Sequence, residues 1–119
     1  MDKKLVVWLH GYGANGSDLK NIPLDCDAFV LSPDAPFVCE EFPYGFQWFS
    51  LRDRSFESIR SGLDNARPIV TKYIKEEAIK NNIPLSKCFV LGFSQGAMLA
   101  MDLIFSFEEL GGIVAFSGG

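Results

Sequence analysis

The sequence is poor in the residues that most often build metal and acid–base sites, since its 119 residues include one histidine and three cysteines. Cys26, Cys39 and Cys88 show no close-paired spacing of the kind that binds zinc. We therefore expect no metal site. Cys88 lies within a predicted strand and is most simply a small core residue, which favours a reducing compartment.

Long hydrophobic runs and an excess of positive charge are also missing. No segment approaches the roughly 20 apolar residues of a membrane span. The run Leu5 to Leu9 is too short for the apolar region of a signal peptide. The net charge of −4 argues against nucleic acid or an anionic membrane surface as a partner. With 48% hydrophobic residues, we expect a single cytoplasmic domain over residues 1–119.

Short apolar runs and helical patterns alternate along the chain. The runs that predict buried strands are Leu5 to Leu9, Ala28 to Leu31, Cys88 to Leu91 and Ile113 to Phe116. Helices are predicted over Asp18 to Asn21, over Ser55 to Asn82 and from the residues after Ser94 to about Phe107. Pro68 should kink the long helix or begin a second one near Ala66 and Arg67. The alternation predicts an α/β fold of about four parallel strands with helices on both faces.

The stretch from Lys87 to Leu99 carries the clearest chemical signal. A buried strand is followed at once by Gly92-Phe93-Ser94-Gln95-Gly96 and then by a helical pattern. Such a strand–turn–helix places a serine on a strained turn and lifts its hydroxyl clear of the sheet. Glycines at 92 and 96 fit because a Cβ there would collide where strand and helix approach. The pattern predicts a nucleophile elbow with Ser94 as the nucleophile.

A second loop should lie beside this turn. His10-Gly11-Tyr12-Gly13 follows the first strand, and ligands bind beyond the carboxyl ends of strands in parallel sheets. If the first strand and the elbow strand are neighbours, the backbone N–H groups of Tyr12 and Gln95 can form a two-donor oxyanion hole.

Residues 33–54 form a long connection with three prolines and six aromatic side chains. Large rings in a loop must pack on something, since leaving them in water forfeits about 25 cal/mol per Å² of apolar area. Two interpretations remain open here: a loop held down by its own rings, or an apolar wall for a substrate. Phe46, Trp48 and Phe49 are the candidate substrate-binding residues.

Four motifs in order resemble the phospholipase/carboxylesterase family of α/β-hydrolases, which includes the acyl-protein thioesterases. They are Leu9 to Gly13, the Pro33 to Pro36 and Gln47 to Phe49 segment, Gly92 to Ala97, and Ala115 to Gly118. The resemblance implies Ser94 as nucleophile, the Tyr12 and Gln95 amides as oxyanion donors and an acyl pocket lined in part by the aromatic loop. It also implies hydrolysis of carboxylic esters or thioesters without a metal or cofactor. A dienelactone-hydrolase-like enzyme is disfavoured, because that group carries cysteine at the elbow.

The chain departs from the family in its triad. In α/β-hydrolases an acid and then a histidine follow the serine, but after Ser94 this chain offers only Asp102, Glu108 and Glu109. Asp102 lies about 12 Å along the helix and cannot orient a base beside Ser94. His10 is the only candidate base, although the matching histidine of the family shapes the oxyanion loop. We therefore expect the N-terminal half of a hydrolase.

Two functional hypotheses remain at this point. In the first, the chain is a serine ester hydrolase whose base and acid come from a missing segment or a separate C-terminal half. In the second, it is an inactive remnant that binds ligands or itself. The last strand, Ile113 to Phe116, would be an exposed apolar edge without charge or proline, which predicts a homodimer through antiparallel pairing of this strand.

Overall fold

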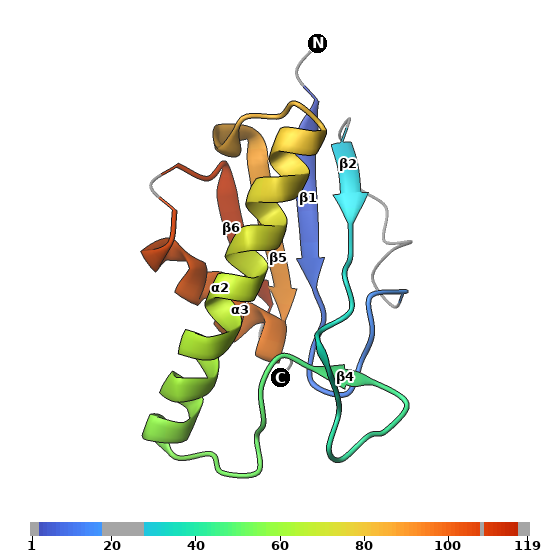
Figure 1. Cartoon of the computed structure of the whole chain (residues 1–119), viewed down its shortest axis with the longest axis vertical. Coiled ribbons are helices and arrows are strands. Elements are labelled where there is room, and N and C mark those ends of the chain that lie inside the picture. The colour runs from blue at the N-terminus through green and yellow to red at the C-terminus, as the bar shows by residue number, and fades with distance from the viewer. Residues whose placement is uncertain (1–2, 18–27, 108, 117–119) are drawn as a thin grey trace.

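A computed structural model describes residues 3–17, 28–107 and 109–116 of the chain (Figure 1). The helix predicted over Asp18 to Asn21 lies outside these residues.

Four of the described strands form a parallel sheet in the order β2-β1-β5-β6. Its members are β1 (Lys4–Leu9), β2 (Ala28–Leu31), β5 (Cys88–Phe93) and β6 (Gly112–Phe116). All four predicted strands are therefore confirmed, and the α/β fold with them. The arrows of β1 and β5 point to the same edge of the sheet in Figure 1, so the loops that follow these strands meet there.

The apolar side chains of β1 are buried on both faces of the sheet. Leu5, Val7 and Leu9 belong to the main core, whereas Val6 and Trp8 form a second cluster on the opposite face. A strand buried on both sides needs a continuous apolar run, which is the pattern that the sequence shows.

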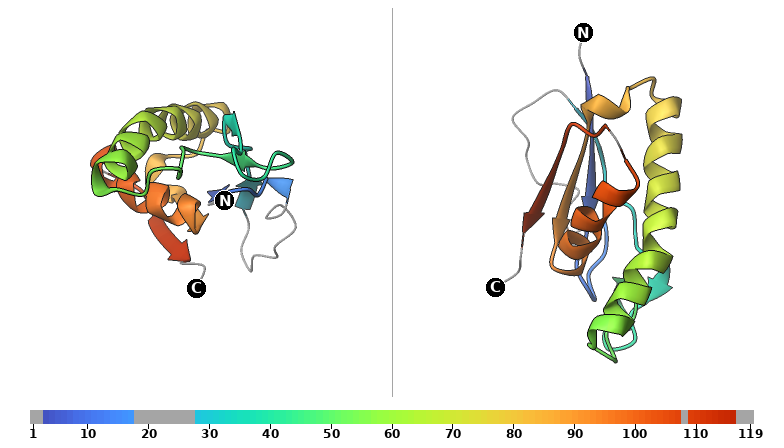
Figure 2. Two further views of the ribbon diagram at one scale, coloured as in Figure 1. Left: turned by 90° about the horizontal axis from the view of Figure 1, so that it is seen from below. Right: turned by 90° about the vertical axis from the view of Figure 1, so that its left-hand side faces the viewer.

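Both described α-helices, α2 (Phe56–Lys80) and α3 (Gln95–Asp102), cover the same face of the sheet (Figure 2). A short 3-10 turn, η1 (Leu85–Lys87), leads into β5, and another, η2 (Leu103–Phe105), follows α3. Helices were expected on both faces, and the described part of the chain places them on one.

Of the two alternatives at Pro68, a kink or a second helix, the second helix beginning near Ala66 and Arg67 is wrong, because α2 continues through Pro68 as one helix. Pro68 lies on the exposed side, where water can bond the Asp64 carbonyl that loses its helical donor. The buried stripe runs unbroken past the proline through Leu63, Ala66, Val70, Ile74 and Ala78. Packing of this stripe on the sheet outweighs the local cost of the proline.

The two helices are joined by a buried carboxylate. Asp102 accepts hydrogen bonds from Arg60 Nη2 at 2.6 Å and from Arg67 Nη1 at 2.5 Å, and its side chain is only 4% exposed. The hydrogen bond of Arg60 to Asp102, together with the charge of Asp102, raises the pKa of Arg60. Asp102 is thus fully committed to joining α3 to α2, in agreement with the expectation that it does not serve Ser94.

We predict that Asp102→Asn lowers the free energy of unfolding by about 2 kcal/mol, because hydrogen bonds between charged groups contribute about 1.5–3 kcal/mol. Urea unfolding followed by circular dichroism measures the change. Asp64→Asn is the matched control, since Asp64 bonds the same two arginines from an exposed position and should lose less than about 1 kcal/mol. Equal losses in the two variants would contradict the assignment of Asp102.

Candidate active site

Ser94 occupies the turn between β5 and α3 in a strained conformation. Its φ of 54° and ψ of −112° lie in a region that side-chain-bearing residues rarely adopt, and its side chain is exposed. Its backbone N–H donates to the Phe116 carbonyl at 2.9 Å, which ties the turn to the end of β6. The predicted sharp turn is confirmed, and the serine stands at its apex.

The two glycines of the turn allow strand and helix to approach closely. A Cβ at Gly92 would lie 2.2 Å from the Gly96 carbonyl oxygen, and a Cβ at Gly96 would lie 2.1 Å from the Leu9 carbonyl oxygen. Both distances are far below van der Waals contact. The first turn of α3 therefore packs directly on the end of β1 as well as on β5.

The loop after β1 lies against the serine, as predicted from strand adjacency. β1 and β5 are paired from Leu5 and Cys88 to Leu9 and Gly92. A Cβ at Gly11 would lie 3.3 Å from the Ser94 Cβ, so the loop backbone touches the turn. Within the described parts of the chain, the backbone N–H groups of Tyr12 and Gln95 donate no hydrogen bond.

His10 is buried and shapes this loop. Its Nε2 accepts a hydrogen bond from the Ala35 backbone N–H at 2.9 Å. Its Nδ1 therefore carries the proton and donates to the Gly11 carbonyl at 2.8 Å. Both ring nitrogens are engaged with the backbone, which does not support His10 as the base for Ser94.

The long connection contains a short hairpin that the sequence patterns did not reveal, formed by β3 (Phe37–Val38) and β4 (Phe46–Gln47). It is fastened to both loops of the site. Phe46 exchanges backbone hydrogen bonds with Gly13 and Ala14 at 3.0 and 2.8 Å. The buried side-chain amide of Gln95 accepts a hydrogen bond from the Trp48 backbone N–H at 2.8 Å and donates one to the Phe49 carbonyl at 2.7 Å.

The three predicted substrate-binding rings do not share one environment. Trp48 and Phe49 belong to the main core, and the Trp48 indole N–H donates to the His10 carbonyl at 2.9 Å. Phe46 is half-buried and packs against that core. A groove of about 450 Å³ runs along the segment and is lined by Phe37, Trp48, Phe49 and Gly62, with polar neighbours. Packing of these rings therefore holds the loop against the core. That the same rings form an apolar wall for a substrate stays a prediction.

Glu40 is the residue of this region that sequence reasoning missed. Its carboxylate accepts hydrogen bonds from the Tyr12 hydroxyl at 2.5 Å, the Ser50 hydroxyl at 2.6 Å and the Leu51 N–H at 2.9 Å, and it pairs with Arg52 at 3.3 Å. Desolvation opposes its ionisation, but these donors prevail and lower the pKa of Glu40 to about 2. Burial, together with the bond to Glu40, raises the pKa of the Tyr12 phenol well above its usual range.

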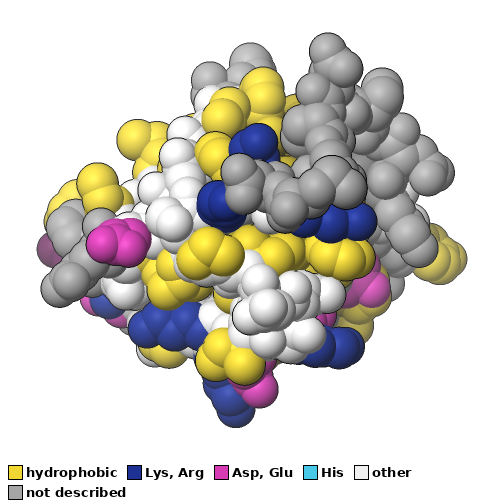
Figure 3. Space-filling view, turned by 90° about the horizontal axis from the view of Figure 1, so that it is seen from above, with side chains coloured by type: hydrophobic (Ala, Val, Ile, Leu, Met, Phe, Trp, Pro, Cys, Tyr) yellow, Lys and Arg dark blue, Asp and Glu magenta, His cyan; other side chains and the backbone are white. Residues whose placement is uncertain are grey.

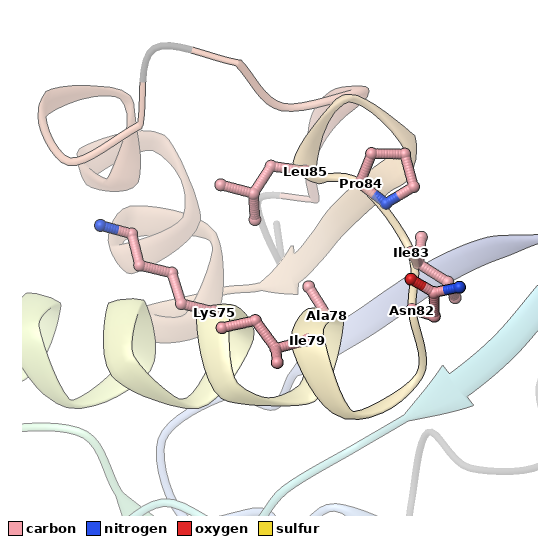
Figure 4. Close-up of a pocket in the computed structure, with 7 residues that line it drawn as sticks. All are labelled: Lys75, Ala78, Ile79, Asn82, Ile83, Pro84 and Leu85. Carbon is pink, nitrogen blue, oxygen red and sulfur yellow. The ribbon is translucent and has the colours of Figure 1, made fainter.

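Another hollow, of about 530 Å³, lies between the end of α2 and η1 (Figure 4). Its lining includes Lys75, Ile79, Pro84 and Leu85, which precede β5, whereas Ser94 follows that strand. Six strand residues separate the two by about 20 Å. Seen from this end of the molecule, apolar side chains alternate with lysine and arginine (Figure 3). The hollow is not part of the site around Ser94.

Three further observations bear on the kind of site. Among the described residues, no group of three or more His, Cys, Asp or Glu side chains is placed to hold a metal ion. Cys39 and Cys88 are buried free thiols. No helix in the described ranges is long and apolar enough to cross a membrane.

A parallel sheet with a strained serine between strand and helix, faced by a glycine-rich loop from the neighbouring strand, defines an α/β-hydrolase. The profile of the phospholipase/carboxylesterase family matches residues 1–119, and the chain belongs to this family of hydrolases.

Individual relatives agree with this assignment. Acyl-protein thioesterase 1 of Eremothecium gossypii is 32% identical over 98% of this chain and 54% of its own length. A rice protein named as a probable inactive carboxylesterase is 31% identical over 97% of the chain and 53% of its own. The crystal structure of esterase PE8 matches with a TM-score of 0.82 and 30% identity, covering 94% of this chain and 56% of that one. The chain spans about half the length of these relatives.

We predict that ionised Glu40 makes the fold sensitive to acid. Its pKa is lowered on folding from about 4.3 in an unfolded chain, so its contribution is complete above about pH 4.5 and is lost as the pH falls towards 2. The wild type should lose more stability between pH 5 and pH 2 than Glu40→Gln, as measured by thermal unfolding at both values. Glu41→Gln, which changes an exposed neighbour, should behave as wild type; equal pH dependence in all three chains would show the prediction to be wrong.

Proposed function

We propose that this chain supplies the nucleophile and the oxyanion hole of a serine hydrolase acting on carboxylic esters or thioesters. The observation that carries the proposal is the exposed Ser94, held at positive φ between β5 and α3 with the Gly11 loop against it. The Ser94 hydroxyl attacks the acyl carbonyl. The Tyr12 and Gln95 N–H groups then bind the oxyanion of the tetrahedral intermediate. As this intermediate collapses, the ester C–O or thioester C–S bond breaks and the alcohol or thiol leaves with the proton taken from Ser94. Water then hydrolyses the acyl-enzyme and frees the carboxylic acid.

The proton acceptor for Ser94 comes, in this proposal, from polypeptide beyond the present sequence or from a separate C-terminal half. The buried imidazole of His10 is bonded at both nitrogens, and Asp102 is held by two arginines. Since the Phe116 carbonyl at the end of β6 accepts a hydrogen bond from the Ser94 N–H, we propose that the proton acceptor follows or pairs with β6. Buried free thiols favour the cytoplasm as the compartment.

The acyl group is proposed to lie along the aromatic segment. Phe46 is the most accessible of the three rings and its backbone pairs with Gly13 in the oxyanion loop. Trp48 and Phe49 support it from the core and line the adjoining groove. Apolar side chains of this kind suit a small acyl chain.

The alternative is a catalytically inactive chain that acts as a binding or self-associating module. The observation in its favour is that no histidine follows Ser94 while the only histidine is structurally committed. An unactivated serine is a weak nucleophile, and loss of one triad member leaves only the contribution of binding and the oxyanion hole.

A fluorophosphonate probe distinguishes the two functions. We expect Ser94 to be labelled when the chain is mixed with the C-terminal half of the Eremothecium thioesterase, and to be labelled at least 100-fold more slowly without it. Ser94→Ala should abolish labelling, which mass spectrometry of the labelled peptide verifies. If no labelling occurs even with the complementing half present, the hydrolase proposal fails and the inactive module stands.

We further propose that the chain alone pairs with a second copy through β6. This strand forms one edge of the described sheet, and its Val114 and Phe116 side chains are 44% and 40% exposed. A twofold axis at Val114 places Phe116 of one copy opposite Gly112 of the other. Because glycine has no side chain, the Phe116 ring fits there without a clash. The strand carries no charge that would oppose this pairing.

Val114→Lys should therefore convert a dimer into a monomer, because it sets two lysines face to face at the axis. Light scattering at tens of micromolar measures the mass of each chain. Ile104→Lys introduces the same charge at an exposed apolar residue of η2 and should leave the dimer intact. A monomeric wild type, or a Val114→Lys chain that still dimerises, would contradict pairing through β6.

A further inference from the structure

The oxyanion loop is fixed at two backbone points on either side of Tyr12. On one side, Gly11 contacts the serine turn. On the other, the Gly13 N–H donates to the Phe46 carbonyl at 3.0 Å, and a Cβ at Gly45 would lie 1.9 Å from the Gly13 carbonyl oxygen. Between these points, the Gly11 carbonyl of the same peptide accepts hydrogen bonds from His10 Nδ1 at 2.8 Å and from the Ala14 N–H at 3.2 Å. The Tyr12 side chain adds a further restraint on the Tyr12 end of this peptide.

That side chain ends on Glu40, a residue 28 positions away. A carboxylate accepts hydrogen bonds and donates none, so it can gather several donors from different segments. Glu40 joins the Tyr12 hydroxyl to Ser50 and to the Leu51 backbone, and its own backbone N–H is held by the Gln47 side chain at 3.0 Å. The Tyr12 ring also meets the Phe42 ring edge to face, with centroids 6.3 Å apart.

We propose that Glu40 is a positioning residue for the oxyanion hole: by binding the Tyr12 hydroxyl it fixes the peptide whose N–H faces the acyl oxygen. This inference rests on the proposed hydrolase function for its catalytic consequence, but the positioning itself is a property of the loop. Donors stabilise an oxyanion most when they are held in place before the charge develops. Glu40 supplies that restraint from outside the loop.

Amide hydrogen exchange tests the positioning without any activity. In Glu40→Gln and in Tyr12→Phe, exchange at the Gly13 and Ala14 amides should accelerate by about tenfold or more, while core amides such as Val7 and Val90 stay protected. Glu41→Gln should leave the loop unchanged. Acceleration of loop and core amides alike would reveal a general loss of stability and overturn the proposal, as would unchanged loop exchange. Tyr12→Phe keeps the ring and serves if Glu40→Gln fails to fold.

Fluorophosphonate inactivation of the chain mixed with the complementing thioesterase half tests the catalytic consequence. Because the oxyanion forms only in the transition state, Glu40→Gln should lower the maximal inactivation rate about tenfold with little change in the half-saturating probe concentration. Tyr12→Phe should have the same effect, and the double variant should lose no more than either single one.

The outcomes separate the two proposals. If the wild type is not labelled but loop exchange responds as expected, the hydrolase function fails and the positioning by Glu40 stands. If the wild type is labelled and Glu40→Gln reacts at the same rate, the hydrolase function stands and Glu40 does not position the oxyanion hole. Additive losses in the double variant would also overturn the inference, because two residues acting through one hydrogen bond cannot lose it twice.

Discussion

The close approach of α3 to the ends of β1 and β5 is the constraint on which the rest of the structure depends. It exists because residues 92 and 96 have no side chain: any Cβ at either position would lie within about 2.2 Å of a carbonyl oxygen. Once strand and helix are this close, the connecting residue must turn at positive φ, and Ser94 takes that strain. The same packing places the loop after β1 beside the serine, so one steric constraint brings together the proposed nucleophile and its proposed oxyanion hole.

The loops around this turn are held by buried polar groups more than by regular structure. The side-chain amide of Gln95 binds two backbone groups of the aromatic segment, and the Trp48 indole N–H donates a hydrogen bond to the His10 carbonyl. His10 in turn binds the backbone of Gly11 and Ala35. Buried polar groups stabilise a structure when each finds a partner, and these are paired across segments far apart in the chain. As a consequence, the only histidine of the sequence shapes a loop, and both of its ring nitrogens are engaged with the backbone.

The parts of the fold that could be predicted from the sequence are those fixed by local chemistry. Continuous apolar runs revealed the four strands, and the spacing of Gly92, Ser94 and Gly96 revealed the turn, because each depends on neighbouring residues. The error at Pro68 arose because packing of a long buried stripe overrode a local rule. Glu40 could not be identified from the sequence because its role depends on contact with Tyr12, 28 positions away. The short hairpin could not be predicted because each of its strands is two residues long. Such partners are brought together only by the fold.

The order of the chain separates two halves of one chemical task. The groups proposed to bind the acyl oxygen and to attack the acyl carbon lie after β1 and β5, whereas the acid and base of α/β-hydrolases follow later in the sequence. An oxyanion hole and binding alone retain about 10³ to 10⁴-fold acceleration over water when a triad is broken. The rest of the rate acceleration requires a proton acceptor within about 3 Å of the Ser94 hydroxyl. The carboxylates of Glu40 and Asp102 are already engaged by arginine and hydrogen-bond donors. In the proposed hydrolase, proton transfer therefore enters from polypeptide that reaches the end of β6, where the Ser94 N–H already donates to the Phe116 carbonyl.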